Sequence, residues 1–482
     1  MLRPISILLV VIDVCSVLFV VTLYRFSSIE GLMPFLGSLP GMLCLAAAFL
    51  LATSTVWLVG YLRGLPAGYG RQARLLIAMN IITVIAAAAV GEVALRVVHE
   101  IVMRQPALHI AEPMMRSWGR TSEQFRAELD KHDPDGPYHE FDPILGWRIG
   151  RNRHSTDGLY ASSLEGLRSS KPGEPVLTWS VSDPIGVQPR RTPFRIALLG
   201  DSYTFGYRVA YEDSWASLIK PRLGARFHVV NFGVIGYSVN QARLKYERDV
   251  RPSHPDIVVL SVISHDFVRD GFIYNFLPYP DMLALPYARP RPVVRDGHLS
   301  LLNTPLPSPD TIFAQRDVHA LPFLEYDINY NASEWERGSW RLLQRSFLFR
   351  ALTSWSYSPP QQKQNAFAVE IRRLGQQIIK DFVDAVRRDG ALPLLVYLPD
   401  RRDLEPSTIG RSAYRILPAP RFFQEAGLEY IDATPCILAV PPERRFLEDN
   451  HYTVEANRAL ASCLPKMILT RLPVQTAMLA NP

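Results

Sequence analysis

The sequence is poor in cysteine and carries little excess charge. Its 482 residues include four cysteines, and the formal net charge is +6. The cysteines form no C-x-x-C pair and show no metal-ligand spacing, so the sequence gives no reason to expect a bound metal. The basic residues are scattered along the chain, whereas a nucleic-acid-binding protein concentrates them in a patch. We therefore expect no metal site and no nucleic-acid partner.

The positions of the cysteines leave one pairing open. Cys15 and Cys44 fall in apolar segments, whereas Cys436 and Cys463 fall in the more polar part of the chain. If that part faces an oxidising compartment, Cys436 and Cys463 could form one disulfide. Two buried free thiols explain the sequence equally well, so the disulfide is a hypothesis.

Three long apolar runs fill the first hundred residues. They cover residues 4–24, 33–62 and 75–98, and each has about the twenty residues that cross a bilayer core. A cleaved signal peptide would explain the first run but not the next two. We expect three transmembrane helices. We also expect Asp13 to be protonated or hydrogen-bonded between helices, and Glu92 to pair with Arg96 one turn further on.

Charges in the loops between these helices predict their orientation. The loop after the second run carries Arg63, Arg71 and Arg74, whereas the loop before it carries Arg25 offset by Glu30. The arginine-rich loop should be cytoplasmic. Everything after residue 98 would then lie outside, which in a bacterium means a multi-pass protein of the inner membrane with its polar part in the periplasm.

The chain beyond the membrane segment is organised around one turn. Residues 194–199, F-R-I-A-L-L, predict a buried strand, and Gly200, Asp201 and Ser202 follow at once. In open α/β sheets the carboxyl ends of the strands are where ligands bind. A serine there acts as a nucleophile only if a base takes its proton and donors hold the oxyanion. G-D-S alone is common in turns, so the other pieces must be found elsewhere.

The longer stretch 200–206, G-D-S-Y-T-F-G, resembles the first motif block of the SGNH/GDSL hydrolases. The resemblance implies that Ser202 is the nucleophile and that its backbone N–H helps to form the oxyanion hole. In the second block of that family, a glycine at a strand end supplies another N–H. Within N-F-G-V-I-G-Y-S at 231–238, Gly236 is the match and Gly233 is the less probable choice.

The third and fourth blocks complete the resemblance with one departure. The family ends its third strand with an Asn that donates to the oxyanion, and here His265 stands at that position. A histidine ring can also donate, although it could equally cap a loop. The fourth block implies that His451 is the general base and that Asp449 orients it, with Glu448 in reserve. Three of the four blocks fit this pattern, and the family requires no metal or organic cofactor.

The order of predicted elements gives the fold class. Strands are expected at 194–199, 227–234, 255–264, 392–398 and 428–431, with helices at 214–223, 239–250, 333–355, 365–389 and 420–426. This alternation predicts an α/β domain with a mostly parallel five-stranded sheet covered by helices on both faces, of the SGNH/flavodoxin-like three-layer type.

The remaining chain divides into a connector and an insertion. We expect a transmembrane region at 1–98, a small β-rich connector at 99–190 and a catalytic domain at 191–472. Within the connector, a helix at 122–131, extended pieces at 139–147 and 159–169 and an edge strand at 176–181 are predicted. Membrane-anchored SGNH proteins carry elements similar to F-D-P-I-L-G-W. Residues 267–331 are too long for a plain connection and form a lid-like insertion or a packed cover.

These expectations favour acyl chemistry. The first hypothesis is a membrane-embedded serine esterase that removes acyl groups, O-acetyl among them, from an envelope glycan or lipid. The second is an O-acyltransferase that passes the acyl group to a cell-surface polysaccharide and draws it from a membrane acyl-donor partner protein. The third is a non-catalytic glycan-binding module, suggested by His265 in place of Asn.

Overall fold

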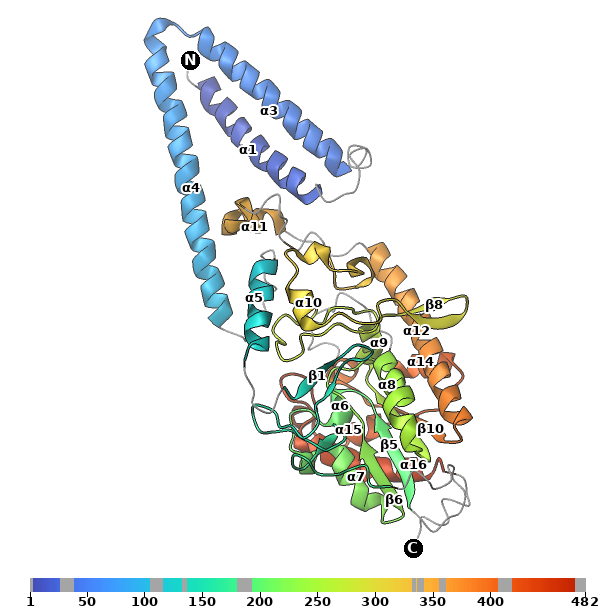
Figure 1. The fold of residues 1–482 in the computed structure, drawn as a ribbon. Coiled ribbons are helices and arrows are strands. Elements are labelled where there is room, and N and C mark those ends of the chain that lie inside the picture. Colours follow the sequence, from blue (N-terminus) through green and yellow to red (C-terminus); the bar gives the residue numbers. More distant parts are fainter. Residues whose placement is uncertain are drawn as a thin grey trace. The chain divides into compact units, whose positions relative to one another are not determined.

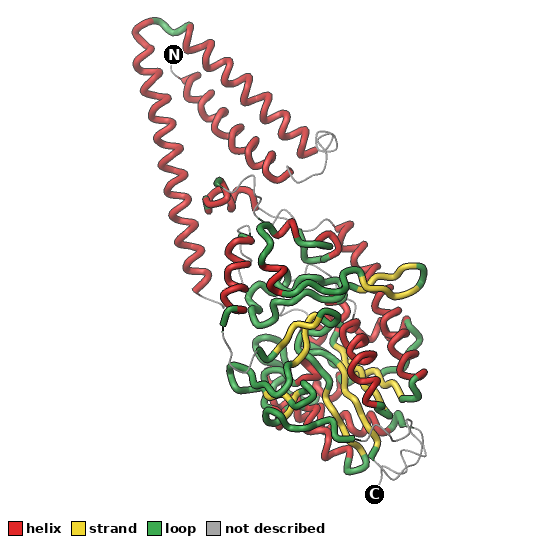
Figure 2. Tube along the Cα trace, viewed as in Figure 1, coloured by secondary structure: helices red, strands yellow, loops and turns green. Residues whose placement is uncertain are grey.

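A computed structural model gives the arrangement of the chain (Figure 2). The structure describes residues 3–26, 39–104, 116–131, 137–179, 193–331, 335, 342–354, 361–405 and 418–472. Two compact units are present, one formed by Met1–Thr121, Arg316–Ala320 and Asn331–Tyr357 and the other by Ser122–Gln315, Leu321–Tyr330 and Ser358–Pro482. The domain boundaries expected near residues 98 and 190 stay predictions, and the second lies outside the described residues.

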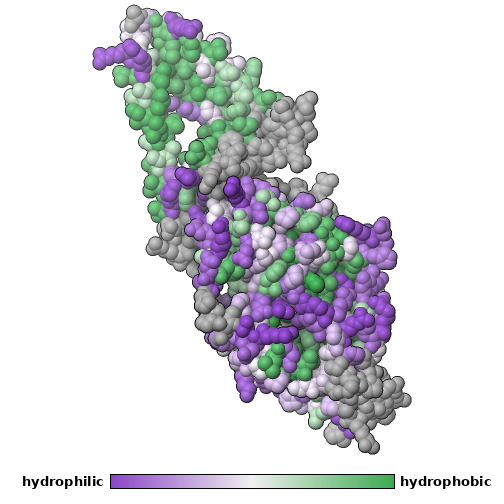
Figure 3. All heavy atoms as spheres, viewed as in Figure 1, coloured by the Kyte–Doolittle hydropathy of each residue, from purple (hydrophilic) through white to green (hydrophobic). Residues whose placement is uncertain are grey.

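The first unit contains three helices that are long and apolar enough to cross a membrane. They are α1 (Arg3–Phe26), α3 (Leu39–Arg63) and α4 (Gly70–Arg104), and their candidate spans are Arg3–Leu23, Leu45–Arg63 and Gly70–Val98. Their outward faces are apolar, as the green surface in Figure 3 shows. The expectation of three membrane helices is confirmed at the level of length and composition.

Both acidic residues within these spans have polar partners. Asn80 Nδ2 on α4 donates to Asp13 Oδ2 on α1 at 3.0 Å, which is the expected hydrogen bond between helices. Arg96 Nε donates to Glu92 Oε1 at 2.9 Å, as expected for residues one turn apart. Glu92 also accepts from the backbone N–H groups of Phe347 at 3.0 Å and Leu348 at 2.9 Å.

Those two amides open α11 (Phe347–Ser354), which corrects the helix expected at 333–355. Residues 343–345 form only a 3-10 turn, and of residues 333–341 the structure describes residue 335 alone. Ser346 Oγ accepts from the N–H of Phe349 at 3.1 Å and so caps the helix at its start. The apolar periodicity predicted the helix, but the capping groups set its beginning.

The second unit is built on a five-stranded parallel sheet. Its strands are β5 (Phe194–Leu199), β6 (Phe227–Asn231), β7 (Ile257–Val262), β10 (Leu392–Tyr397) and β11 (Ile431–Asp432). Their spatial order is β11-β10-β7-β5-β6, and every pairing is parallel. This is the flavodoxin-like order, in which the second and third strands are added on opposite sides of the first, so that the switch point lies between β5 and β7. The predicted fold class is confirmed.

Helices cover both faces of the sheet (Figure 1). One face is covered by α8 (Val239–Lys245), α12 (Gln361–Arg388) and α14 (Ala419–Glu425). The other is covered by α7 (Trp215–Leu223), α15 (Thr434–Leu438) and α16 (Val454–Leu469). Because β5 and β7 are buried on both faces, their sequences are mainly apolar along their length and do not alternate between apolar and polar residues. The helix expected at 239–250 is α8 followed by a π-helical turn, Tyr246–Val250.

The connector folds into a helix and two hairpins. The helix is α5 (Trp118–Leu129), and the hairpins pair β1 (His139–Asp142) with β2 (Gly146–Ile149) and β3 (Ala161–Ser162) with β4 (Arg168–Ser169). The extended pieces expected at 139–147 and 159–169 are thus present. The edge strand expected at 176–181 is not formed over residues 176–179, and its last two residues lie outside the described chain.

The insertion is closely packed. It follows α9 (Ser264–Arg269) and contains the hairpin β8 (Pro292–Arg295) and β9 (His298–Leu301) and the short helix α10 (Pro309–Phe313). Apolar side chains such as Tyr274 and Phe276 are buried within it, and the lid-like role expected for residues 267–331 stays a prediction. Elsewhere in the unit, Cys436 and Cys463 are joined as a disulfide.

Candidate active site

Ser202 lies in the turn that follows β5. The strand ends at Leu199, and a single helical turn, α6 (Ser202–Phe205), begins at once. The Asp201 side chain caps this turn by accepting from the Tyr203 N–H at 2.9 Å. Ser202 is thereby held at the carboxyl end of β5, where the sequence predicted it.

His451 reaches Ser202 from the opposite end of the chain. Its Nε2 lies 2.9 Å from the Ser202 Oγ. The loop that carries it is closed by a hydrogen bond from the Leu447 N–H to the His451 carbonyl at 2.7 Å. The Tyr203 hydroxyl also donates to the carbonyl of Asn450 at 2.6 Å, which fixes the loop to the serine turn. The hydroxyl and the imidazole are therefore within hydrogen-bonding distance across 249 residues of sequence.

Asp449 lies on the other side of the imidazole. Its Oδ1 is 3.2 Å from the His451 Nδ1 and 3.3 Å from the His451 backbone nitrogen. The approach to Nδ1 is bent, so the distance is that of a hydrogen bond but the angle is not. Such contacts are often poorly aligned in enzymes without substrate and tighten when it binds. Glu448, the reserve residue, is exposed and makes no contact with His451 among the described residues.

Two backbone N–H groups are the candidates for the oxyanion hole. Within the described chain, neither the Ser202 N–H nor the Gly236 N–H donates a hydrogen bond to protein. Gly236 adopts φ 77°, a left-handed conformation that favours glycine. The Gly233 N–H is already engaged, because it donates to Asn231 Oδ1 at 2.9 Å. The geometry therefore favours Gly236 over Gly233 as the second donor.

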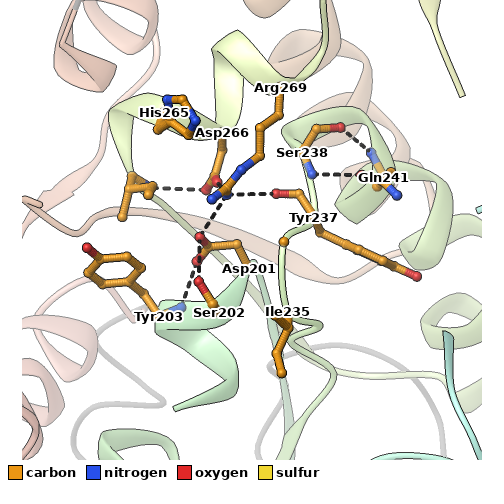
Figure 4. A network of polar contacts seen from close by, with 12 residues as sticks. Asp201, Ser202, Tyr203, Ile235, Tyr237, Ser238, Gln241, His265, Asp266 and Arg269 are labelled. Carbon is orange, nitrogen blue, oxygen red and sulfur yellow. Dashed lines mark hydrogen bonds and ion pairs between the residues drawn. The ribbon is translucent and has the colours of Figure 1, made fainter. Parts of the chain in front are cut away.

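His265 is placed differently from the other predicted residues. Its Nε2 lies 2.8 Å from the Tyr279 hydroxyl, and its buried Nδ1 has no hydrogen-bond partner in the described structure. Figure 4 shows its ring beyond Asp266 and away from Ser202. Burial, together with the charges of neighbouring arginines, lowers the pKa of His265 well below its usual value, so the ring is neutral. Its role as third oxyanion donor stays a prediction, and no described contact joins it to Ser202.

A buried ionic network adjoins the nucleophile (Figure 4). Arg269 Nη1 donates to Asp201 Oδ2 at 3.0 Å, and it also contacts Asp266. Burial, followed by the nearby Asp201 carboxylate, raises the pKa of Asp266 well above its usual value. One guanidinium thus lies between two carboxylates, which limits the cost of burying them. The network fixes Asp201 and, through it, the turn that presents Ser202.

The pKa of Asp449 is shifted in the opposite direction to that of Asp266. Burial raises the pKa of Asp449, but its contacts with His451 and the charge of Arg208 outweigh it, so the net pKa is lowered. Asp449 is therefore ionised at neutral pH and able to stabilise an imidazolium. Among the residues that the structure describes, no group of three His, Cys, Asp or Glu side chains could hold a metal ion.

Sequence reasoning missed the residues that support the site. Arg269 and Asp266 occupy one face of α9, and nothing in their spacing announced a contact with Asp201. Trp147 and Arg289, which hold the loop of Gly236, lie far from it in the sequence. The available signal was the F-D-P-I-L-G-W stretch at 141–147, whose resemblance to elements of membrane-anchored SGNH proteins assigns no chemistry to it.

Comparisons with known proteins give structural matches alone, since no family model and no curated protein matches this chain. One solved structure similar to it is a lipase/acylhydrolase from Enterococcus faecalis, with 12% identity, a TM-score of 0.31 and coverage of 58% of this chain and 97% of that one. Another is a member of the lipolytic G-D-S-L family from Veillonella parvula, with 12% identity, a TM-score of 0.29 and coverage of 58% and 100%.

A third similar structure is an acetyl-xylooligosaccharide esterase from Geobacillus, with 14% identity, a TM-score of 0.28 and coverage of 57% of this chain and 94% of that one. These solved structures include members of the family that the motif blocks resemble. Because the TM-scores are near 0.3, the assignment of the site rests on the distances within this chain.

Proposed function

We propose that this chain is a membrane-anchored serine esterase that acts on acyl esters of an envelope glycan or lipid. The observation that carries the proposal is the chain of contacts from Ser202 Oγ to His451 Nε2 at 2.9 Å and from His451 Nδ1 to Asp449 Oδ1 at 3.2 Å. A nucleophile, a base and an orienting carboxylate in this order form the arrangement of a serine hydrolase.

The proposed reaction runs through an acyl-enzyme. The Ser202 oxygen attacks the ester carbonyl while His451 takes its proton, and the N–H groups of Ser202 and Gly236 donate to the oxyanion. Collapse of the tetrahedral intermediate breaks the ester bond, and His451 returns the proton to the leaving alcohol. Water, deprotonated by His451, then attacks the acyl group, which leaves as the carboxylic acid and restores the Ser202 hydroxyl.

We further propose that the site lies on the outer side of a bacterial inner membrane. Arg63, Arg71 and Arg74 cluster between α3 and α4 and favour a cytoplasmic position for that turn. The disulfide between Cys436 and Cys463 supports an oxidising compartment for the second unit. Envelope glycans and lipids are the esters that an enzyme anchored there would meet.

The proposal is tested on the full chain in detergent micelles. Wild type and Ser202→Ala are compared for turnover of p-nitrophenyl acetate and for labelling by a fluorophosphonate probe, which reacts with activated serines. We expect both signals in wild type and neither in the variant. Equal turnover by the two proteins, or an unlabelled wild type without turnover, would refute the esterase and leave the binding module.

An acceptor experiment separates hydrolysis from transfer. The wild-type protein is given p-nitrophenyl acetate in the presence of a soluble envelope polysaccharide, and acetate and acetylated glycan are both measured. We expect acetate as the product. Acetylated glycan in excess of acetate would replace the esterase with the acyltransferase and would call for a search for its membrane donor.

A further inference from the structure

The N–H of Gly236 and the carbonyl of Ile235 belong to one peptide group, and a side chain of the connector binds that carbonyl. Trp147 Nε1 donates to the Ile235 carbonyl at 3.0 Å, and the indole ring is fully buried. The Ile235 C=O and the Gly236 N–H lie in one rigid plane because the peptide bond does not rotate. Fixing the oxygen therefore limits the directions in which the N–H can point. The hydrogen bond also polarises the amide, which makes its N–H a better donor.

A side chain of the insertion binds the next peptide group along the chain. Arg289 Nη1 donates to the Gly236 carbonyl at 2.6 Å and to Gln241 Oε1 at 2.8 Å. Two successive peptide planes are thus fixed on either side of the Gly236 Cα. Since the torsion angles of Gly236 relate these two planes, its left-handed φ of 77° is set by side chains outside its own loop.

The two clamping side chains also support each other. The Arg289 guanidinium lies 4.7 Å from the centre of the Trp147 ring, a distance at which a buried cation and an indole attract each other. The Tyr237 ring meets Trp147 edge to face at 5.6 Å, and its hydroxyl donates to the Trp147 carbonyl. Trp147 is therefore fixed both in its ring and in its backbone.

We propose that Trp147 is a positioning residue for the oxyanion hole, and that the hairpin of β1 and β2 is part of the catalytic apparatus. The inference rests on the proposed esterase function. Trp147 touches no reacting atom and acts through the Ile235–Gly236 peptide. A residue that only filled the core would contribute to stability, whereas this one contributes to stabilisation of the transition state.

The test is the variant Trp147→Phe in the full chain, which keeps an aromatic ring and loses the N–H donor. Removal of an oxyanion donor costs about 10²–10³-fold in kcat. Here the donor stays but is misdirected, so we expect kcat for p-nitrophenyl acetate to fall about 10-fold, with KM nearly unchanged. Affinity for a boronate inhibitor, which forms a tetrahedral adduct with the serine, should fall by a similar factor.

The chain supplies a matched control in Trp179. Its Nε1 also donates to a backbone carbonyl, that of Ser253 at 2.7 Å, which lies in the turn before β7 and away from the carboxyl end of that strand. We expect Trp179→Phe to keep the wild-type kcat. A second replacement of Trp147, by the benzothiophene isostere β-(3-benzothienyl)alanine, removes the N–H while keeping the shape of the ring, so a loss of kcat there cannot come from a cavity.

The outcomes separate the inference from the function beneath it. If wild type is active, Ser202→Ala is inactive and both Trp147 replacements keep the wild-type kcat, the inference is wrong and the esterase stands. If Trp147→Phe and Trp179→Phe lose kcat and melting temperature alike, while the isostere is unchanged, Trp147 is structural and the inference is wrong. If wild type is no faster than Ser202→Ala, the esterase fails and the inference fails with it.

Discussion

Two loops meet at Ser202, and they are held in different ways. The loop of His451 lies near the surface, where the His451 and Asp449 side chains are 19% and 37% exposed. Its support comes from a tight turn and from contacts with exposed groups such as Arg208. The loop of Gly236 is buried, and side chains from the connector and the insertion fix its successive carbonyls.

The difference matches what each loop has to do in the proposed reaction. A base exchanges protons with the hydroxyl, the leaving alcohol and water, so access to solvent suits it. An oxyanion donor works by being oriented before charge develops, so a rigid and dry setting suits it. The site therefore combines a fixed half, which belongs to the core, with an accessible half, which belongs to the surface.

The largest effect is expected at the centre of the accessible half. His451→Ala removes the only imidazole within reach of Ser202 among the described residues. We expect kcat for p-nitrophenyl acetate to fall about 10³-fold, within the usual range for loss of a general base. Fluorophosphonate labelling should slow by a similar factor. If activity remains near wild type, another group is the base, and the assignment of the base to the His451 loop is wrong.

The next effect tests which acidic residue orients the imidazole. Asp449→Asn should lower kcat about 10²-fold, because an amide favours the wrong tautomer of His451. The reduction should be smaller than for a buried carboxylate, since Asp449 is 37% exposed. Glu448→Gln, one residue earlier, is the matched control and should keep wild-type kcat. The reverse result would move the orienting role to Glu448.

An effect on stability is expected at Asp270, a buried residue that binds the start of α8, the helix after the Gly236 loop. Asp270 Oδ1 accepts from the Asn240 N–H at 3.0 Å, and burial raises the pKa of this carboxyl to about 7. Between about pH 4 and pH 7 the folded chain holds a proton that the unfolded chain has lost, so the stability of the wild type falls as the pH rises through that window.

The variant Asp270→Asn removes this titration. We expect its free energy of unfolding relative to wild type to increase by about 3 kcal/mol from pH 5 to pH 8. The melting temperatures of the two proteins, compared at both pH values, report this change. Asp384→Asn, at an exposed position of α12, is a control in which the difference should not change with pH. If the melting temperatures of Asp270→Asn and of wild type change equally with pH, Asp270 is ionised in the folded chain.

The smallest effect is expected at the rim of the accessible half. Arg208 Nε lies 3.1 Å from Asp449 Oδ2, and the two side chains are 54% and 37% exposed. Exposed ion pairs contribute little, so Arg208→Gln should lower kcat less than about threefold. The effect should shrink further at high salt, which screens the pair. A loss comparable to that of Asp449→Asn would show that the surface half is held as firmly as the buried half.

The local sequence was informative wherever function is encoded within a few residues. The strand and turn at Ser202, the glycine at Gly236 and the D-x-H spacing of Asp449 and His451 were all found from short patterns. The structure brings Ser202, His451 and Asp449 into contact, whereas the part of Gly236 in the oxyanion hole stays a prediction. His265 was chosen by motif position, but its ring faces Tyr279, because the orientation of a side chain depends on neighbours that a motif does not specify.

What the sequence alone determined is the order of strands and helices, the three apolar spans and the residues that carry the proposed chemistry, since periodicity and short motifs are local properties. The tertiary structure decided the disulfide, the start of α11 and the clamp of Trp147 and Arg289 on the Gly236 loop. Each of these is a contact between groups far apart in the chain, and such contacts form only when packing brings the segments together.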